Sequence, residues 1–290
     1  MNMDFPHITI LGGGLLGGSL ARAIGALENP PAIRLWARKP ETIAAATTLG
    51  IPNGTTDLAE AVQDASLLVL AVPVGSMAGL VSSAVEAGLP GHCLITDVGS
   101  VKGTPHREIG QVLHGHGNHF IGSHPMAGSE RNGLSAATVD LFENAACLLT
   151  NDAGAPADQA AALERFWQKI GCRTSWMSAA IHDELVARIS HLPHLIAASA
   201  ARVCLKDPSE SRFGGGGLRD TTRVAAGNPV MWAEIVIENR QAIIAPLQET
   251  IADLREILTA LESGDQEQAH RWLALGKQKR DTVPPPAQLA

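Results

Sequence analysis

The stretch HITILGGGLLG, residues 7–17, decides the fold of this chain. Its first half is apolar and rich in β-branched residues, which is typical of a buried strand, and its second half has the glycine spacing GxGxxG. The residues that follow predict a helix, so the motif is a strand, a glycine turn and a helix. In that context Gly12 permits a tight turn, Gly14 lets the backbone approach a pyrophosphate, and Gly17 lets helix and strand pack closely. The motif therefore predicts a dinucleotide-binding turn.

The dinucleotide expected at this turn is a nicotinamide cofactor, and the sequence after the second strand favours NADP. An acidic residue about 20 positions beyond the last glycine normally binds the ribose 2′-hydroxyl. Ala37 occupies that place, and Arg38 and Lys39 follow it. Two cations suit a 2′-phosphate, although a solvated basic turn is the alternative, and NAD remains the alternative cofactor. The candidate cofactor-binding residues from this motif are Gly12, Gly14, Leu15, Leu16, Gly17, Arg38 and Lys39.

Strands and helices alternate over residues 1–178, which predicts an α/β domain with a Rossmann-type, doubly wound sheet. The expected strands are residues 7–11, 32–36, 65–72, 93–97, 119–122, 146–150 and 173–177. Beyond residue 178 only helical spacing is present, beginning with the long segment Ala179–Val203. Residues 179–290 are therefore expected to form an all-α domain, in which the glycine run within Phe213–Leu218 predicts a flexible loop.

Composition argues against several classes of partner. Lys and Arg number 22 against 29 Asp and Glu, giving a net charge of −7, whereas nucleic acid or an anionic membrane surface requires a basic patch. The most apolar stretch, residues 65–81, is interrupted by Pro73, Gly75 and Gly79 and is short for a membrane span. The 4 cysteines form no CxxC pair, so we expect free thiols in a reducing cytoplasm, with no nucleic acid, membrane or metal partner.

Polar residues crowd into five otherwise apolar stretches: DVGSVKG (97–103), GSHPMAGSE (122–130), ISHLPH (189–194), GGGLRDTTRVAAGNP (215–229) and ENR (238–240). In this order, behind a GxGxxG turn and before a helical tail, they resemble the prephenate and arogenate dehydrogenase family over nearly the whole chain. The resemblance implies oxidative decarboxylation of a cyclohexadienol, in which a hydride passes to NAD(P)⁺, the ring carboxylate leaves as CO₂ and the ring becomes aromatic. Prephenate would give 4-hydroxyphenylpyruvate, and arogenate would give tyrosine.

The resemblance also implies a role for individual residues. His124 matches the catalytic histidine, a base suited to neutral pH, and Ser100 matches the serine that orients it and touches the nicotinamide end of the cofactor. Val72 is a further candidate contact of the cofactor. The candidate substrate-binding residues are Arg223 for a carboxylate, the helix pair His191 and His194, and Ser129 and Glu130 at the pocket mouth. The family further implies a homodimer through intertwined helical domains, with the active site between the domains.

Simpler interpretations exist for several of these residues. His191 and His194 are three positions apart and could bind a metal, but the sequence shows no third ligand. His124 precedes a proline and could merely cap a turn. Lys102 could reach a phosphate or be exposed to solvent, and Trp232 could belong to the core rather than to the pocket.

Three other functions compete with an NADP-preferring prephenate dehydrogenase. An arogenate dehydrogenase would need a carboxylate for the substrate ammonium, for which Glu130 is the nearby acid, whereas donors such as His194 suit the keto acid prephenate. A β-hydroxyacid or imine-reducing dehydrogenase would carry a catalytic lysine where the helix 179–203 has histidines. A catalytically silent dinucleotide sensor should have lost His124 or Arg223, and both are present.

Overall fold

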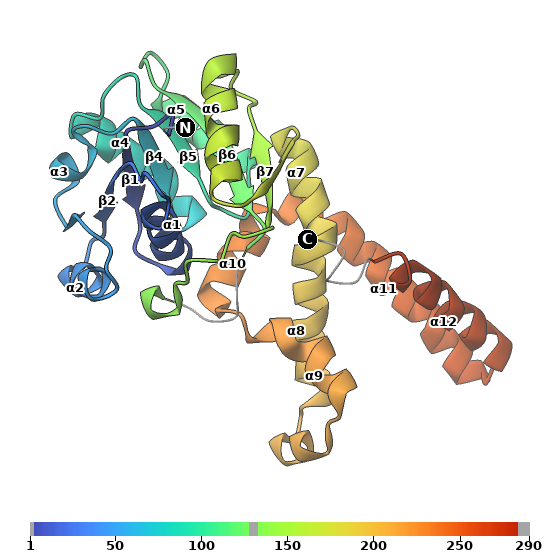
Figure 1. Ribbon diagram of the computed structural model, residues 1–290. Helices are drawn as coiled ribbons and strands as arrows, with labels where there is room; N and C mark the ends of the chain where they lie inside the picture. The colour runs from blue at the N-terminus through green and yellow to red at the C-terminus, as the bar shows by residue number, and fades with distance from the viewer. Residues whose placement is uncertain (1–2, 128–132, 284–290) are drawn as a thin grey trace. The chain divides into compact units, whose positions relative to one another are not determined.

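The computed structural model describes residues 3–127 and 133–283 and is built around one eight-stranded sheet (Figure 1). The strand order is β3-β2-β1-β4-β5-β6-β7-β8; pairing is parallel throughout except between β6 and β7. The strands are β1 (His7–Leu11), β2 (Ala32–Trp36), β3 (Gly54–Thr55), β4 (Leu67–Leu70), β5 (Leu94–Asp97), β6 (His119–Pro125), β7 (Ala146–Thr150) and β8 (Arg173–Trp176). The predicted Rossmann-type α/β fold and all seven expected strands are confirmed; only the two-residue β3 was not anticipated.

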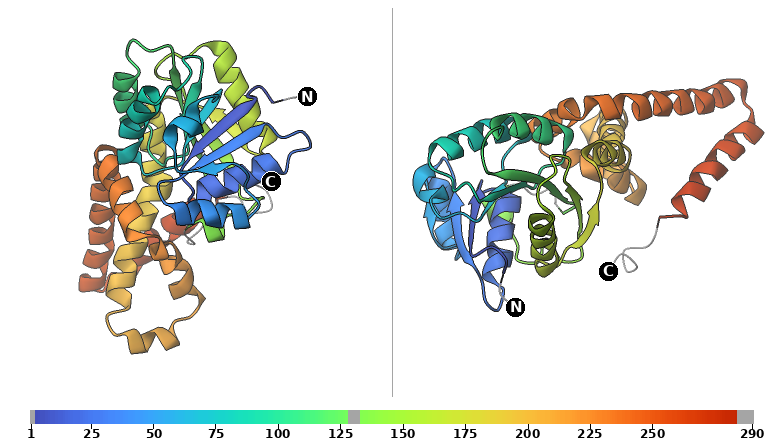
Figure 2. Two further views of the ribbon diagram at one scale, coloured as in Figure 1. Left: turned by 90° about the vertical axis from the view of Figure 1, so that its left-hand side faces the viewer. Right: turned by 90° about the horizontal axis from the view of Figure 1, so that it is seen from above.

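Both faces of the sheet are covered by helices, as Figure 2 shows. Alternate strand residues point to opposite faces, so Leu67 and Val69 join one apolar cluster, whereas Leu68 and Leu70 join the other. This explains why β4 has no polar position. The first cluster is completed by α1 (Leu15–Gly25), α2 (Pro40–Thr48) and α6 (Ala157–Lys169), and the second by α3 (Leu58–Val62), α4 (Met77–Glu86) and α5 (Gly103–Val112).

A nearly continuous helical segment follows the sheet. It consists of α7 (Ala179–Val186), a wider π turn (Ala187–His191) and α8 (Leu192–Cys204). The π turn ends two residues before Pro193. A proline has no N–H to donate and its ring crowds the preceding turn, which the wider turn accommodates. The predicted helical character of this segment is confirmed, with the added π turn.

Only part of the glycine run is a loop, so the loop predicted over 213–218 was too long: Gly214 and Gly215 are extended, whereas Gly216 and Gly217 are helical. A 3-10 turn ends at Phe213, and α9 (Gly216–Thr222) begins within the glycines. Gly214 supplies the physical reason, because a Cβ there would lie 2.3 Å from Cδ2 of Leu218. The missing side chain therefore lets α9 fold back closely. A further helix, α10 (Pro229–Glu238), then leads to Asn239.

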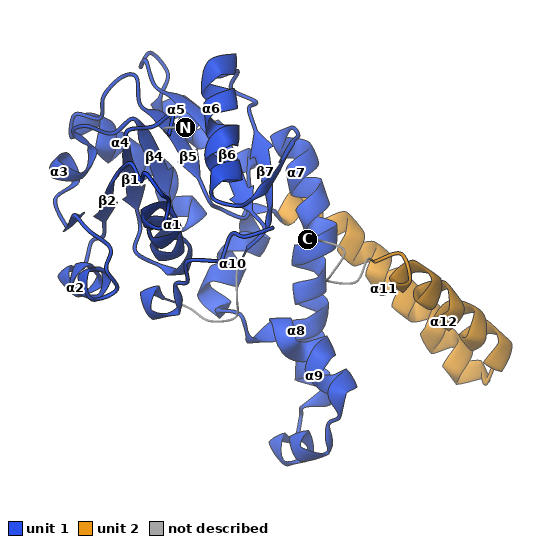
Figure 3. Cartoon of the chain, in the orientation of Figure 1, with its two compact units in different colours: residues 1–239 blue, residues 240–290 orange. Residues whose placement is uncertain are grey.

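The chain divides into two compact units, residues 1–239 and residues 240–290 (Figure 3). The second unit consists of α11 (Arg240–Ser263) packed against α12 (Gln266–Arg280). Its turn is built by Gly264, with φ +71°, and by Asp265, whose side chain caps α12 by accepting from the N–H of Gln268. Within the described ranges, no helix is long and apolar enough to cross a membrane.

The glycine turn allows a matched pair of stability measurements. A Cβ on Gly17 would lie 1.9 Å from the carbonyl oxygen of Gly12, so Gly17→Ala should lower the free energy of unfolding by about 3 kcal/mol. A Cβ on Gly25, in the same helix, meets nothing within 4 Å, so Gly25→Ala should raise it by about 0.5–1 kcal/mol. Urea titrations of the two variants and the parent check both signs; equal effects would contradict the close packing at Gly17.

Candidate active site

The glycine turn after β1 is shaped for close approach of another molecule. Gly12 has φ +120° and donates its N–H to the carbonyl of Trp36 at 2.9 Å, which closes the turn between β1 and β2. A Cβ on Gly12 would lie 2.2 Å from the carbonyl oxygen of Ala71 and 3.1 Å from a methyl group of Val72. At Gly14, by contrast, a Cβ would meet nothing within 4 Å, so the N-terminus of α1 is open. An open helix N-terminus behind a glycine turn fits a pyrophosphate.

The basic pair lies at the same edge of the sheet as this turn. Ala37 is buried directly after β2, and Arg38 and Lys39 are exposed next to it, with Lys39 at the start of α2. The position at which an acid would bind a ribose 2′-hydroxyl therefore offers only a methyl group, beside two cations.

The carboxyl ends of four neighbouring parallel strands bring the remaining candidates to this edge. In sheet order, Gly12 follows β1, Val72 lies beyond β4, Ser100 lies beyond β5, and His124 is the next-to-last residue of β6. Three strand spacings separate the first position from the last, which is roughly 14 Å. The strand order reverses between β1 and β4, and ligands of open α/β sheets bind at such a switch point.

The loop that carries Ser100 is fixed by a buried ion pair. Asp97 and Lys102 are both fully buried and paired, and Asp97 also accepts the N–H of Gly99 at 2.8 Å and that of Ser123 at 3.0 Å. Both sequence interpretations of Lys102, a phosphate ligand or a solvent-exposed side chain, were wrong. Its ammonium is used internally, and removing either partner would leave an uncompensated buried charge.

His124 is the first of three side chains joined by hydrogen bonds. Its Nδ1 lies 2.9 Å from Nε2 of His182, and Nδ1 of His182 lies 2.8 Å from Oδ1 of Asp183. The Asp183 carboxylate also accepts the N–H groups of Lys102 and Gly103, each at 2.8 Å. Burial alone would raise the pKa of Asp183, but these hydrogen bonds lower it, so the carboxylate is ionised and only accepts.

An ionised Asp183 dictates where the protons of the two histidines lie. His182 must carry its proton on Nδ1 in order to donate to the carboxylate, so its Nε2 has a lone pair. His124 then donates from Nδ1, which leaves the lone pair of His124 on Nε2. Burial, followed by the charges of His182 and Lys102, holds the pKa of His124 well below its usual range. His124 is therefore neutral at pH 7, with Nε2 ready to accept a proton.

Two more histidines lie buried in the same unit. His191 is 1% exposed, with Nδ1 3.0 Å from the amide nitrogen of Asn239. His194 stacks on Trp232 with ring centroids 3.5 Å apart, which places Trp232 beside the histidines, although the sequence allowed a core position. Burial lowers the pKa of His191 to about 4 and also lowers that of His194, against a hydrogen bond to the backbone of Val224. Both rings are neutral at pH 7.

Of the other predicted substrate-binding residues, the structure describes Arg223 but not Ser129 or Glu130. Arg223 is exposed and begins the short 3-10 turn after α9, next to the residue whose backbone bonds His194. Its guanidinium can therefore be reached from solvent. Ser129 and Glu130 lie outside the described residues. Ser100 is half-buried in the loop after β5.

Sequence reasoning missed His182, Asp183 and Asn239. The adjacent histidine and aspartate near the start of a helix were a possible signal, and Asn239 belongs to the ENR motif, for which no role was assigned. Their importance depends on contacts between distant segments, which no local pattern contains. In the described portions of the chain, no three His, Cys, Asp or Glu side chains are grouped to hold a metal ion.

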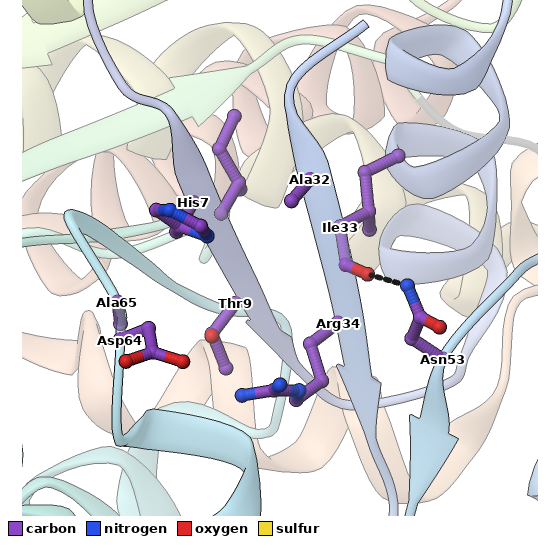
Figure 4. A pocket seen from close by; sticks show the side chains of 9 residues that line it. His7, Thr9, Ala32, Ile33, Arg34, Asn53, Asp64 and Ala65 are labelled. Atoms are coloured by element: carbon purple, nitrogen blue, oxygen red, sulfur yellow. Dashed lines mark hydrogen bonds between the residues drawn. The ribbon is translucent and has the colours of Figure 1, made fainter.

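A small pocket at the opposite edge of the sheet is too small for a dinucleotide (Figure 4). It is bordered by the amino ends of β1 and β2, including His7, Arg34 and Asp64, and its volume is about 40 Å³. Asn53 closes one side by donating to the carbonyl of Ile33 at 3.2 Å. This volume accommodates only a few water molecules.

Comparisons with known proteins relate the chain to one family. The model of the prephenate dehydrogenase nucleotide-binding domain matches residues 20–176, and that of the prephenate dehydrogenase dimerization domain matches residues 178–275. A cyclohexadienyl dehydrogenase from Zymomonas mobilis is 39% identical over 269 residues, 90% of either chain.

Two solved structures are also similar over nearly the whole chain. A prephenate dehydrogenase from A. aeolicus, in complex with hydroxyphenyl propionate and NAD⁺, has a TM-score of 0.88 at 26% identity, covering 98% of this chain and 100% of that one. A Synechocystis arogenate dehydrogenase has a TM-score of 0.78 at 27% identity, covering 96% and 100%. Domain models, sequence identity and fold thus agree, and the chain belongs to the prephenate dehydrogenase family, whose members are NAD(P)-dependent oxidoreductases of aromatic amino acid biosynthesis.

Proposed function

We propose that this chain is an NADP-preferring prephenate dehydrogenase in which His124 is the general base. The observation that carries the proposal is the unprotonated Nε2 of His124, set by Asp183 through His182, at the strand edge that holds the glycine turn. When bound, the nicotinamide supplies the hydride acceptor for the hydrogen on the hydroxyl-bearing ring carbon. His124 Nε2 takes the hydroxyl proton as that hydride departs.

Decarboxylation completes the reaction. The bond between the ring and its carboxylate breaks, CO₂ leaves, and the electron pair of that bond enters the ring. The oxygen that gave its proton to His124 takes a proton back, so the phenol forms and the histidine returns to its neutral state. His182 stabilises the transient imidazolium by accepting from its Nδ1, and Asp183 in turn holds His182.

Substrate selectivity follows from the groups around the site. We assign Arg223 to a substrate carboxylate, His191 and His194 to the keto-acid side chain, and Ser129 and Glu130 to the pocket mouth. Arogenate carries an ammonium group, which needs a hydrogen-bond acceptor. The carboxylate of Asp183 is already engaged by three N–H groups and is not free for that purpose. This supports prephenate, with arogenate as the alternative.

Cofactor preference rests on the end of β2. Ala37 offers no carboxylate to a ribose hydroxyl, and Arg38 and Lys39 are exposed at that edge. We therefore assign Arg38 and Lys39 to the 2′-phosphate of NADP, with NAD as the alternative. The pyrophosphate is assigned to Gly12–Gly17, and the nicotinamide end to Val72 and Ser100.

We further propose a homodimer formed through the helical domain, with the functional domain boundary after residue 178, where the two family models meet. Large apolar side chains are exposed in regular stripes, which supports this assembly. The stripe on α11 has helical spacing and consists of Ile244, Ile251, Leu254, Leu258 and Leu261. The stripe along the segment from α7 to α8 recurs every seventh residue and consists of Ile189, Ile196 and Val203.

We also propose that the protein is in the cytoplasm. The buried free thiols of Cys93, Cys147 and Cys172 support such a reducing compartment.

The direct test mixes the purified protein with prephenate or arogenate, each with NAD⁺ or NADP⁺, and follows the reduced nicotinamide. We expect the highest kcat/KM with prephenate and NADP⁺. Arg38→Ala should weaken NADP⁺ binding roughly 10- to 100-fold and leave NAD⁺ nearly unchanged, because one charge-assisted hydrogen bond is lost. Arg34→Ala, in the middle of β2, is the control. A higher kcat/KM with arogenate would reverse the substrate assignment, and equal use of both cofactors would reverse that of Arg38.

A second test removes the base. His124→Asn keeps a hydrogen-bonding group of similar reach but cannot take a proton, so kcat should fall about 10²–10⁴-fold with NADP⁺ affinity little changed. The exposed His116 provides the control His116→Asn, which should retain parental kcat. Arg223→Ala should instead raise KM, because a carboxylate clamp acts in ground and transition states alike.

The pH dependence of kcat/KM is an independent test of His124 as the general base. Because the pKa of His124 is lowered, the neutral base persists below pH 6.5, and kcat/KM should fall only as the pH drops through that lowered pKa. A kcat within a few-fold of the parent in His124→Asn, at saturating substrate, would show that another group is the base.

The dimer is tested on one helix. Ile251→Glu places a charge in the apolar stripe of α11, and Ala252→Glu places the same charge one residue, about 100°, around the helix. Ile251→Glu should shift the particle mass measured by light scattering from dimer to monomer, whereas Ala252→Glu should remain dimeric. A dimeric Ile251→Glu protein, or a monomeric parent, would refute this interface.

A further inference from the structure

Asn239 is a buried amide that joins two parts of the site. It lies at the end of α10, is 3% exposed, and its side-chain nitrogen has two neighbours. One is the backbone carbonyl oxygen of Asp183 at 2.9 Å, and the other is Nδ1 of His191 at 3.0 Å. A primary amide nitrogen has two hydrogens, so it can donate to both.

The Asp183 carbonyl determines which way round this amide lies. A carbonyl oxygen can only accept, so the amide nitrogen, and not its oxygen, must face it. The same nitrogen also faces His191 and has no lone pair to offer. His191 Nδ1 is therefore the acceptor, and because burial lowers the pKa of this ring to about 4, its single proton at neutral pH lies on Nε2.

The N–H group at Nε2 of His191 has no hydrogen-bond acceptor among the residues that the structure describes. This nitrogen is buried, and Nδ1 of His194 is likewise buried with no hydrogen-bond partner in the described part of the chain. Buried polar atoms are almost always hydrogen-bonded, and an exception indicates a missing partner. The missing partner of an N–H group is an acceptor, such as a carbonyl or carboxylate oxygen.

We propose that Asn239 is a positioning residue that holds His191 in the Nε2–H form, and that this N–H donates to an oxygen of the keto-acid side chain of the substrate. The second part rests on the proposed function. A ring locked as a donor cannot accept a hydrogen bond from an ammonium group, so Asn239 favours the keto acid over the corresponding amino acid.

The proton position is measured directly. In protein labelled with ¹⁵N-histidine, long-range ¹H–¹⁵N correlation spectra distinguish the two neutral forms of each imidazole, and His191→Gln identifies the signals of His191. We expect Nε2–H for His191 in the parent protein, and a mixture of both forms in Asn239→Leu. A parent His191 protonated on Nδ1, or an unchanged form in Asn239→Leu, would overturn the proposal. The parent measurement stands even if the variant does not fold.

Asn118 provides a matched control. It is also buried, and its amide nitrogen also donates two hydrogen bonds, in this case to the carbonyls of Pro90 at 2.7 Å and Cys93 at 3.0 Å. It lies just before β6, at the other end of that strand from His124. Asn118→Leu therefore removes an equivalent pair of hydrogen bonds without touching His191.

The kinetic consequence separates positioning from folding. In Asn239→Leu we expect the KM for prephenate to rise roughly tenfold with kcat within a few-fold of the parent, and the preference for prephenate over arogenate to shrink by a similar factor. Asn118→Leu should change neither. Equal KM increases in both variants, or an unchanged preference in Asn239→Leu, would refute the role in selectivity. A parent protein inactive with both substrates would refute the proposed function and leave the proton position intact.

Discussion

The candidate site depends on the hydrogen bonds of one residue, Asp183. Its carboxylate fixes the N-terminus of α5 through two backbone N–H groups and orients His182, which in turn orients His124. Its backbone carbonyl orients Asn239 and thereby His191. The two histidines end with opposite properties at Nε2, a lone pair on His124 and a proton on His191. Two neutral imidazoles thus take different chemical roles because they are connected to different atoms of the same residue.

Burial keeps these histidines neutral, so that each ring has one proton in a defined place. Removing a histidine from water disfavours its charged form, so the pKa values of His124, His182 and His191 are all lowered. A neutral ring has one proton, and a single hydrogen bond can then decide where it lies. In an exposed, partly charged histidine the same hydrogen bond would decide little. The apolar surroundings and the polar network therefore act together, since neither alone defines the proton positions.

Much of the fold could be predicted from the sequence because its signals are local. The glycine turn and the apolar strands are read from adjacent residues, and the runs at 32–36 and 146–150 match β2 and β7 residue for residue. The reversal at β7 could not be predicted, because a short apolar strand does not encode its direction. The burial of Lys102 could not be predicted either, since it depends on Asp97 lying opposite. The positions of His124 and Arg223 came from family resemblance, and the partners of His191 from tertiary contacts alone.

The buried pair of Asp97 and Lys102 restricts how the sequence of this protein can evolve. Replacing either residue alone leaves a charge in the interior, at a cost of about 3–5 kcal/mol, which is a large part of the roughly 5–15 kcal/mol that stabilises a typical native protein. Replacing both together by apolar residues removes that cost, but Asp97 would then no longer accept the N–H groups of Gly99 and Ser123. The two positions are therefore coupled, because replacing them one at a time passes through a destabilised protein. As long as the pair is retained, the geometry of the loop that carries Ser100 is retained as well.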